Sequence, residues 1–383
     1  MAVTSCRHFS GYKPCGKNSS CEDSCLHKSI PSSYVLIVHL GAIGAVVRAT
    51  SLLRGIKRKY PGSHVTWVTD APSDQLLRNH PLIDRVLTTK ADDMLTLSAL
   101  EFDTAFMIDK SLKAAGVLKQ TQADVVFGFK ADARGGAILP ATPAANELWQ
   151  LGLDNQQKFF VNTKAETQLM VEALELGEFQ RDEYDLHLSF EEQLEALRRR
   201  QEWLQGREVT IGLNTGCSSV IPYKKLSVDF QRRIIQIIQN ELNVTVVLLG
   251  GPEDTERNQQ IGQGLSVVQS STTSGLRDGL VSVAACDVVL TGDSLGMHMA
   301  ISQKKYVVAW FGPTCAQEID LYGRGEKILS KAACAPCWKR VCDKQTMCYD
   351  QVSIVEVIEA LKRGFSQCLP TSSSKQPFSE ICS

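Results

Sequence analysis

The sequence predicts an α/β protein built from two parallel-sheet domains in tandem. Its 383 residues, 43% of them hydrophobic, exceed what one domain usually holds and are ample for two buried cores. Short apolar runs alternate with helical stretches along most of the chain, a pattern typical of parallel sheets covered by helices on both faces. The alternation stops at 165–206 and then starts again, which places the division between the domains there.

The first domain is expected over 34–165. Its opening, "YVLIVHLGAIGAVVRATSLLRGIKRKYPGSHVTWVTD" at 34–70, predicts a strand at 35–38, a glycine turn, a helix over 46–60 and a second strand. Further strands are predicted at "VLTT" (86–89), "FDTAFMID" (102–109) and "DVVFGF" (124–129). A stretch rich in Glu, Gln, Leu and Arg (166–207) then predicts connecting helices.

The second domain is expected over 208–350. A helix is predicted at 228–242, and strands followed by turns are predicted in "EVTIGLNTG" (208–216), "VTVVLLGGPED" (244–254), "CDVVLTGDS" (286–294) and "YVVAWFGPT" (306–314). An amphipathic helix follows at 351–365, and the Ser-rich tail at 366–383 is expected to be disordered.

The charge balance argues against nucleic acid as a partner. With 41 basic and 42 acidic side chains the net charge is −1, so any anion site must be local. The first 33 residues contain no apolar run of signal-peptide length, and no later stretch approaches the roughly 18 to 20 apolar residues of a membrane span. We therefore expect a cytoplasmic protein whose contact with the inner membrane would be peripheral.

Two turns of the second domain have the composition of an anion site. "NTGCSS" contains Thr215 and Gly216, which permit close backbone approach, and Lys224 follows as a cation for a diphosphate. In "TGDSLGMH", Asp293 and Ser294 are expected to cap a helix whose N-terminus offers N–H donors to an anion. Ordinary chain reversals and a capped helix with a core histidine are the alternatives.

Two cysteine clusters predict metal sites. The first has the spacing C-x2-C-x4-C-x5-C, compact enough for four thiolates to converge on one tetrahedral ion: Cys334, Cys337, Cys342 and Cys348. We interpret it as structural zinc or iron, with four unrelated buried thiols as the alternative. The extension at 1–33 carries a looser set for a second ion: Cys6, Cys15, Cys21 and Cys25.

These pieces together resemble the bacterial ADP-heptose glycosyltransferases, the lipopolysaccharide heptosyltransferase family, over roughly 34–364. The opening segment, "FMIDKSLKAAGVLKQTQADVVFGF", "IGLNTG", "LLGGPED" and "LTGDSLGMHMAISQKKYVVAWFGPT" match in order. "CAPCWKRVCDKQTMC" resembles the heptosyltransferase II-like branch, and cysteine-bound iron is known among the related protein heptosyltransferases. The resemblance implies the GT-B fold, with two Rossmann-like domains facing a central cleft. It also implies inverting transfer from an ADP-sugar without a catalytic metal.

The resemblance assigns roles to residues of the second domain. Lys224 matches the lysine that meets the donor phosphates, and Glu253 matches the acid near the ribose. The diphosphate-binding start of a helix is matched by Asp293, Ser294 and His298. The match departs at Leu295, which stands before Gly296 where the family has glycine directly after the Ser or Thr. The entry to that helix is therefore expected to be shifted.

The first turn departs from the family pattern where the chemistry would be. The family usually has glycine and then aspartate, the proposed general base, whereas this chain has Gly44 and Ala45. Losing a positioned base typically costs about 10² to 10⁴ in rate. His39 and Asp109 end neighbouring strands and are candidates for a relocated base, and His39 is preferred because histidine exchanges protons near neutral pH. A packing role at the strand end is the alternative for His39.

Several readings stay open at the level of sequence. The acceptor is lipopolysaccharide core, another glycan or a protein, and a more acidic acceptor or a different donor would make the base less important. A scaffold that binds nucleotide sugar without transferring it is another possibility. A nicotinamide-dependent oxidoreductase is disfavoured because "GAIG" (41–44) lacks the full G-x-G-x-x-G pattern.

Overall fold

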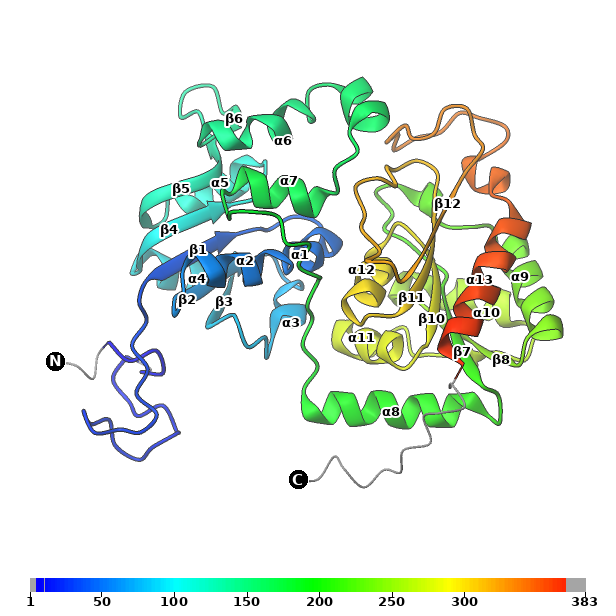
Figure 1. The fold of residues 1–383 in the computed structure, drawn as a ribbon, viewed down its shortest axis with the longest axis horizontal. Coiled ribbons are helices and arrows are strands. Elements are labelled where there is room, and N and C mark those ends of the chain that lie inside the picture. The colour runs from blue at the N-terminus through cyan, green and yellow to red at the C-terminus, as the bar shows by residue number, and fades with distance from the viewer. Residues whose placement is uncertain (1–4, 10, 370–383) are drawn as a thin grey trace. The chain divides into compact units, whose positions relative to one another are not determined.

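The computed structural model describes residues 5–9 and 11–369, so 370–383 of the expected disordered tail lie outside the described residues. The chain forms two compact units: unit 1 comprises Met1–Ser189 and Gln317–Asp320, and unit 2 comprises Phe190–Ala316 and Leu321–Ser383. Each unit contains one six-stranded sheet with helices packed on it (Figure 1). The prediction of an α/β protein with two parallel-sheet, Rossmann-like domains is confirmed.

Unit 1 has the strand order β3-β2-β1-β4-β5-β6, in which only the β5–β6 pair is antiparallel. Its strands are β1 (Tyr34–Val38), β2 (His64–Thr69), β3 (Arg85–Thr88), β4 (Glu101–Met107), β5 (Gln122–Ala131) and β6 (Ile138–Pro140). Its helices are α1 (Ile43–Ala49), α2 (Leu52–Lys59), α3 (Asp74–Leu77), α4 (Ala91–Ser98), α5 (Leu112–Leu118), η1 (Pro143–Ala145), α6 (Asn146–Gln150), the π-helical η2 (Gln157–Val161) and α7 (Glu166–Ala173).

The helix predicted over 46–60 is two helices, α1 and α2, so the prediction of one continuous helix is wrong. The break lies at Thr50 and Ser51. The Thr50 hydroxyl donates to the Val47 carbonyl at 2.6 Å, and the Ser51 hydroxyl donates to the Arg48 carbonyl at 2.9 Å. Such side chains compete for helix carbonyls, which explains why the regular ladder is interrupted there.

Unit 2 has the strand order β12-β11-β10-β7-β8-β9, and all of its pairs are parallel. Its strands are β7 (Val209–Asn214), β8 (Val244–Leu249), β9 (Val268–Gln269), β10 (Val288–Gly292), β11 (Tyr306–Phe311) and β12 (Gly325–Leu329). Its helices are α8 (Phe190–Leu204), η3 (Pro222–Lys224), α9 (Val228–Glu241), η4 (Pro252–Asp254), α10 (Thr255–Gly262), α11 (Leu276–Ala284), α12 (Leu295–Ser302), η5 (Cys348–Gln351) and α13 (Ile354–Cys368). In Figure 1, α9, α10 and α13 lie on one face of this sheet and α11 and α12 on the other.

The stretch predicted as connecting helices, 166–207, is divided between the two units. α7 belongs to unit 1, whereas α8 belongs to unit 2 and is tied to α11 by Arg199, whose guanidinium lies 2.5 Å from the Asp278 carboxylate. Residues 182–189 between these helices are not helical. Tyr184, Leu186 and Leu188 are buried there in alternation, a period of two that the Glu-rich composition of the region does not indicate.

The N-terminal extension is held to unit 1 by Arg7. Its guanidinium donates to Asp84 at 2.5 Å and to the carbonyls of Ser63 and Gly62 at 3.0 and 2.6 Å. Burial alone would raise the pKa of Asp84, but hydrogen bonds from the Val65 N–H and from Arg7 hold it below its usual value. The contact therefore contributes stability above the usual carboxyl pKa and loses it as the pH falls through the lower, folded-state pKa.

Arg7→Ala should release the extension while leaving the sheet of unit 1 folded. Charge-assisted hydrogen bonds of this kind are each worth about 2 kcal/mol, enough to shift local opening by more than tenfold. Hydrogen exchange should show faster exchange in 5–33, with β1 to β4 unchanged. Lys28→Ala is the matched control, because Lys28 pairs only with Asp23 inside the extension among the contacts of the described residues. Equal protection in Arg7→Ala and wild type would contradict this anchor.

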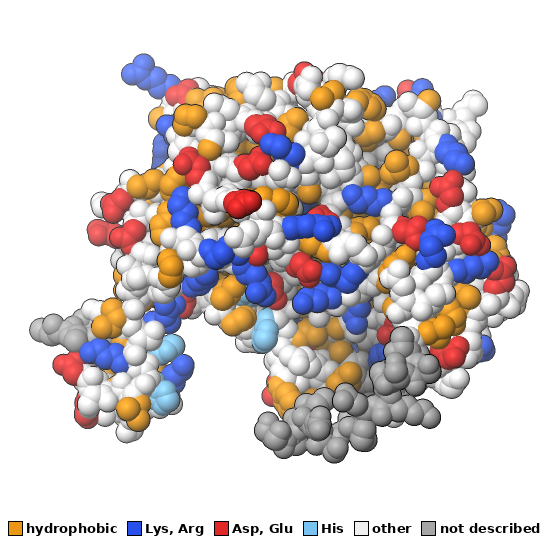
Figure 2. Space-filling view, viewed as in Figure 1, with side chains coloured by type: hydrophobic (Ala, Val, Ile, Leu, Met, Phe, Trp, Pro, Cys, Tyr) orange, Lys and Arg blue, Asp and Glu red, His pale blue; other side chains and the backbone are white. Residues whose placement is uncertain are grey.

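Acidic and basic side chains are interspersed over the face shown in Figure 2, in keeping with the net charge of −1. Within the described ranges, no helix is both long and apolar enough to cross a membrane.

Candidate functional site

The strand order reverses once in each sheet, between β1 and β4 in unit 1 and between β7 and β10 in unit 2. In open α/β sheets, ligands bind beyond the carboxyl ends of the strands at such a point, because the connections leave it in opposite directions. His39 and Asp109 follow β1 and β4, and Thr215 and Asp293 follow β7 and β10. The topology thus gathers predicted site residues beyond the carboxyl ends of the central strands, which we call the edge of each sheet.

His39 and Asp109 meet at the edge of the unit 1 sheet. His39 is 6% exposed, and its Nδ1 lies 3.4 Å from Oδ2 of Asp109. The same carboxylate oxygen accepts the backbone N–H of Leu40 and, at 2.9 Å, that of Gly41. Asp109 therefore fixes the turn that follows β1 and lies beside the ring of His39.

These contacts separate the roles that the two residues can play. Burial alone would raise the pKa of the Asp109 carboxyl, but the neighbouring His39 and hydrogen bonds from the Leu40 and Gly41 N–H groups hold it below its usual range. A carboxylate stabilised in this way is a weak proton acceptor. Asp109 is therefore the less suited of the two candidates for a relocated base, and the role of His39 stays a prediction.

Ala45 lies half-buried in the first turn of α1 and brings no acid to this edge. Arg48, one turn later on the same face, pairs instead with Glu166 of α7 at 2.5 Å. Lys158 of η2 pairs with Glu318 at 3.3 Å, within the Gln317–Asp320 segment of unit 1. Together with a fifth side chain they form a group that we call the charge cluster: Arg48, Lys110, Lys158, Glu166 and Glu318.

The charge cluster is electrostatically connected to the edge of the sheet. Burial alone would raise the pKa of Glu166, but the cations Arg48, Lys110 and Lys158 and the nearby His39 bring it below its usual value. Burial raises the pKa of Glu318, and the neighbouring Glu166 raises it further. Sequence patterns did not indicate Arg48 or Glu166, because only the fold brings α1 and α7 together.

Asn214, the last residue of β7, ties the two turns at the edge of unit 2 together. Its side-chain amide donates to the Gly216 carbonyl at 3.1 Å, to the Thr291 hydroxyl at 3.2 Å and to the Ser294 hydroxyl at 2.9 Å. A Cβ on Gly296 would lie 2.5 Å from the same amide, so this position accepts only glycine without rearrangement. Gly296 therefore meets β7 closely even though Leu295 stands before it.

The predicted capping of α12 by the Ser294 side chain is wrong. Ser294 is the N-cap residue, but its side chain makes no capping hydrogen bond, and its hydroxyl accepts from the Asn214 amide. The N-terminus of such a helix presents N–H donors and a partial positive charge to an anion.

The structure brings Lys224, Asp293 and His298 together at the start of α12. Lys224 Nζ lies 3.5 Å from Asp293 Oδ2, and His298 Nε2 lies 4.0 Å from Asp293 Oδ1. The three side chains are between 7% and 16% exposed, so their interactions are only partly screened by water. This ammonium beside a helix N-terminus is a suitable arrangement for holding a phosphate group.

The turn after β7 packs against Asp254, an acid that the sequence interpretation missed. A Cβ on Gly216 would overlap the carboxylate of Asp254, which is buried and accepts the Gly251 N–H at 3.0 Å. Burial raises the pKa of Asp254. Glu253, the acid singled out from sequence, is exposed beside it. The run "GGPED" offered both acids, and only the structure shows which one faces the turn.

Thr215 supports this turn from within. It is fully buried, and its hydroxyl donates to the Leu249 carbonyl at 3.1 Å and lies 2.5 Å from the Asn258 side-chain oxygen. The backbone carbonyl of Thr215 accepts from Arg257 at 3.0 Å. Thr215 thus holds the backbone of the turn in place while its side chain faces the core.

The cysteines of the 334–348 segment lie near one another. Burial raises the pKa of the Cys348 thiol to about 11, and the other three cysteines of the predicted set add to the increase. The segment is fastened near Lys224, because the Cys342 N–H donates to the Tyr223 hydroxyl at 3.1 Å. Among the described residues, however, no group of three or more Cys, His, Asp or Glu side chains is arranged to hold a metal ion.

That finding applies to both predicted metal sites, and neither is confirmed. In the N-terminal set, the Asn18 amide lies 3.7 Å from the Cys25 sulfur. Every cysteine in the described part of the chain is a free thiol.

Comparison with known proteins gives a consistent picture. The model of a family described as glycosyltransferase family 9 (heptosyltransferase) matches residues 94–348. Lipopolysaccharide heptosyltransferase 1 of Campylobacter coli is 20% identical over 353 residues, which cover 86% of this chain and 98% of that protein.

Solved structures of the same kind share the fold. The family 9 glycosyltransferase of Veillonella parvula matches with a TM-score of 0.67 and 16% identity, over 88% of this chain and 99% of that one. The ADP-heptose lipopolysaccharide heptosyltransferase II of E. coli matches with a TM-score of 0.62 and 16% identity, over 87% and 98%.

Proposed function

Because the chain belongs to glycosyltransferase family 9 and is a glycosyltransferase, we propose that it transfers a heptose or similar sugar from an ADP-sugar to an envelope glycan such as lipopolysaccharide core. The proposal takes transfer to be inverting and independent of a catalytic metal. ADP-heptose is named as the donor of the E. coli heptosyltransferase II whose fold this chain shares. The acceptor is proposed from the curated relative, which acts on lipopolysaccharide.

The edge of unit 2 is the observation that carries this proposal. Lys224 and the start of α12 offer a cation and N–H donors to one small region, and Gly216 and Gly296 let Asp254 and Asn214 pack closely against the two turns. Such groups stabilise the negative charge that develops on a departing diphosphate, and one well-aimed donor is worth about 3 kcal/mol. In this proposal, protein groups stabilise the leaving group without a catalytic metal.

At the edge of unit 1, His39 would take the proton of the acceptor. The acceptor hydroxyl oxygen attacks the anomeric carbon, the bond from that carbon to the diphosphate oxygen breaks, and ADP leaves with the bonding electrons. The hydroxyl proton moves to Nε2 of His39. Asp109, at 3.4 Å from Nδ1, would hold the tautomer that leaves Nε2 free to accept and would stabilise the imidazolium.

Ala45 favours a second candidate. If His39 only packs at the strand end, the chain would bind an ADP-sugar without transferring it and would serve as a scaffold in glycan assembly. Protein O-glycosylation is the same chemistry with a different acceptor, and the described residues of unit 1 do not choose between the acceptors.

We propose the cytoplasm as the compartment, because the free cysteines of the described chain fit a reducing environment.

The direct test is an ADP-release assay with mass spectrometry of the products. Purified full-length protein would be given ADP-heptose and a panel of heptose-deficient lipopolysaccharide, other glycans and protein acceptors. Transfer with inverted anomeric configuration to a glycan is the expected result. Tight ADP-heptose binding without turnover on any acceptor would support the scaffold function in place of transfer. Absence of ADP-heptose binding would overturn both candidates.

We also propose that the 334–348 segment binds a structural zinc or iron ion. Burial raises the pKa of the Cys348 thiol, and the other three cysteines of the set raise it further, so a soft cation would stabilise the four as thiolates, although their described arrangement does not close into a ligand shell. The ion would draw Cys334, Cys337, Cys342 and Cys348 together and fix the segment against Tyr223, beside Lys224. It would have no part in the transfer.

Cys337→Ser should remove about one equivalent of metal and lower the melting temperature, because a four-thiolate ion contributes its binding free energy to folding. Metal content by plasma mass spectrometry and thermal unfolding measure the two effects on the same sample. Cys286→Ser is the matched control, since Cys286 is buried in the core of unit 2 and outside the segment. Unchanged metal content, or metal absent from the wild type, would refute the proposal.

A further inference from the structure

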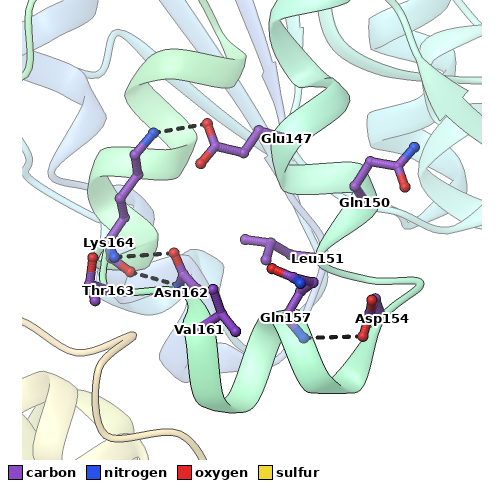
Figure 3. Close-up of a pocket in the computed structure, with 9 residues that line it drawn as sticks. All are labelled: Glu147, Gln150, Leu151, Asp154, Gln157, Val161, Asn162, Thr163 and Lys164. Carbon is purple, nitrogen blue, oxygen red and sulfur yellow. Dashed lines mark hydrogen bonds and ion pairs between the residues drawn. The ribbon is translucent and has the colours of Figure 1, made fainter.

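Unit 1 contains a hollow that none of the roles above uses. It measures about 530 Å³, within the roughly 300 to 1,000 Å³ of small-molecule sites, and it lies between α6, η2 and the chain that leads to α7. Figure 3 shows Glu147 and Leu151 on the α6 side, with Val161, Asn162 and Lys164 facing them.

The walls of the hollow are fixed by hydrogen bonds within unit 1. Asp154 accepts the backbone N–H groups of Gln156 and Gln157 at 2.8 and 3.1 Å, which sets the start of η2. The Asn162 side chain donates to the Lys164 carbonyl at 3.0 Å and accepts the Lys164 N–H at 3.1 Å. The Lys164 ammonium lies 2.8 Å from Glu147. A hollow with preset walls binds without first having to order its own lining.

The lining combines hydroxyl-binding groups with a modest apolar surface. Among the described residues, the side-chain amides of Gln150 and Gln157 have no hydrogen-bond partner, and Figure 3 shows the Gln157 amide close to Leu151. An amide donates and accepts at once, as a sugar hydroxyl does. Leu151 and Val161 supply the apolar surface against which the C–H face of a pyranose can pack.

The charges of the lining select against anions. Glu147 and Asp154 are acidic, and Lys164, the one base among the lining residues, is already shared between Glu147 and Glu172, each at 2.8 Å. A phosphate or carboxylate would meet two carboxylates and a neutralised ammonium, so it would be repelled. An uncharged polyol meets no such penalty.

We propose that this hollow binds an uncharged saccharide unit of the acceptor glycan, at a distance from the hydroxyl that reacts. The inference deepens the proposed function and rests on it for the identity of the ligand as acceptor. η2 supports the connection, because Gln157 and Val161, four residues apart, line the hollow while Lys158 joins the charge cluster with Glu166 and Glu318. One short helix thus takes part in both the hollow and the cluster that adjoins His39.

Saturation-transfer NMR on the full-length protein tests the proposal without the donor. The probes are the neutral disaccharides maltose, lactose and α-1,3-mannobiose, with glucuronic acid and glucosamine as charged comparisons. At least one neutral disaccharide should show saturation in the wild type, about five- to tenfold weaker binding in Gln157→Ala, and none in Thr163→Trp, in which an exposed lining residue is enlarged to fill the hollow.

Gln156→Ala is the matched control, because Gln156 is next to Gln157 in the chain but is exposed and outside the lining. This variant should bind as the wild type does. Absence of saturation for all neutral probes in the wild type would overturn the proposal. Saturation in Gln157→Ala and Thr163→Trp equal to that in the wild type would also overturn it. Preference for glucosamine or glucuronic acid would overturn the assignment of an uncharged ligand. ADP-heptose binding, measured separately on the same samples, decides the proposed function independently of these outcomes.

Discussion

His39→Ala should lower kcat for sugar transfer by about 10² to 10⁴, the usual cost of losing a positioned general base. The ADP-sugar dissociation constant should stay within a few-fold of wild type, because His39 belongs to unit 1 and the proposed donor groups belong to unit 2. Steady-state kinetics at saturating donor and acceptor measure the first quantity, and calorimetric titration with ADP-heptose measures the second.

Three further variants show whether the loss is chemical. Asp109→Asn keeps an oxygen to accept the Gly41 N–H but no longer stabilises the imidazolium, so it should lose much of the rate as well. His64→Ala removes another buried histidine, at the amino end of β2, and should leave kcat close to wild type. Ala45→Asp in the His39→Ala background restores an acid at the family position and should recover about tenfold or more. Full activity in His39→Ala would return His39 to a packing role.

Lys224→Ala should weaken ADP-heptose binding and lower kcat by about 10² to 10³, the range found when one well-placed stabilising group is removed from a developing charge. The variant leaves Asp293 beside the helix start without its cation, at the place where the diphosphate would bind, and this adds like-charge repulsion to the loss. Steady-state kinetics with ADP release and direct titration with ADP separate the two effects.

Lys225 provides the control for Lys224. It is the next residue in the chain and carries the same charge, whereas Lys224 forms the ion pair with Asp293. Lys225→Ala should therefore change donor binding less than Lys224→Ala does. Equal effects of the two variants would mean that the region attracts the donor by its general charge, and that Lys224 has no particular place at the start of α12.

Much of the fold could be predicted from local sequence. The strands that carry the edges, β1, β4, β7 and β10, are short apolar runs followed by turn residues, and that pattern is enough to place them and the residues after them. The details that failed depend on competition between hydrogen bonds. Thr50 and Ser51 break a periodic helix, and the Ser294 hydroxyl accepts from the Asn214 amide and does not cap its own helix.

The site was predictable where residues follow strand ends and not where partners come from distant segments. Lys224, Asp293 and His298 lie together as the turn motifs suggested. Arg48 and Glu166 are in contact only because α7 returns to the sheet after 118 residues of chain, and no local pattern announces such a pair. The three-dimensional closeness of the four cysteines was indicated by their spacing, but a ligand shell was not established by it.

The two sheets share one strand order, and this has a consequence for how the chain divides its work. Asp109 and Asp293 lie at corresponding positions, each just after the strand that is fourth in chain order in its sheet. One is surrounded by backbone N–H groups and a histidine, the other by a lysine and a histidine. The protein thus repeats one arrangement of strands in its two units, and the acids at equivalent positions differ in the groups that neighbour them.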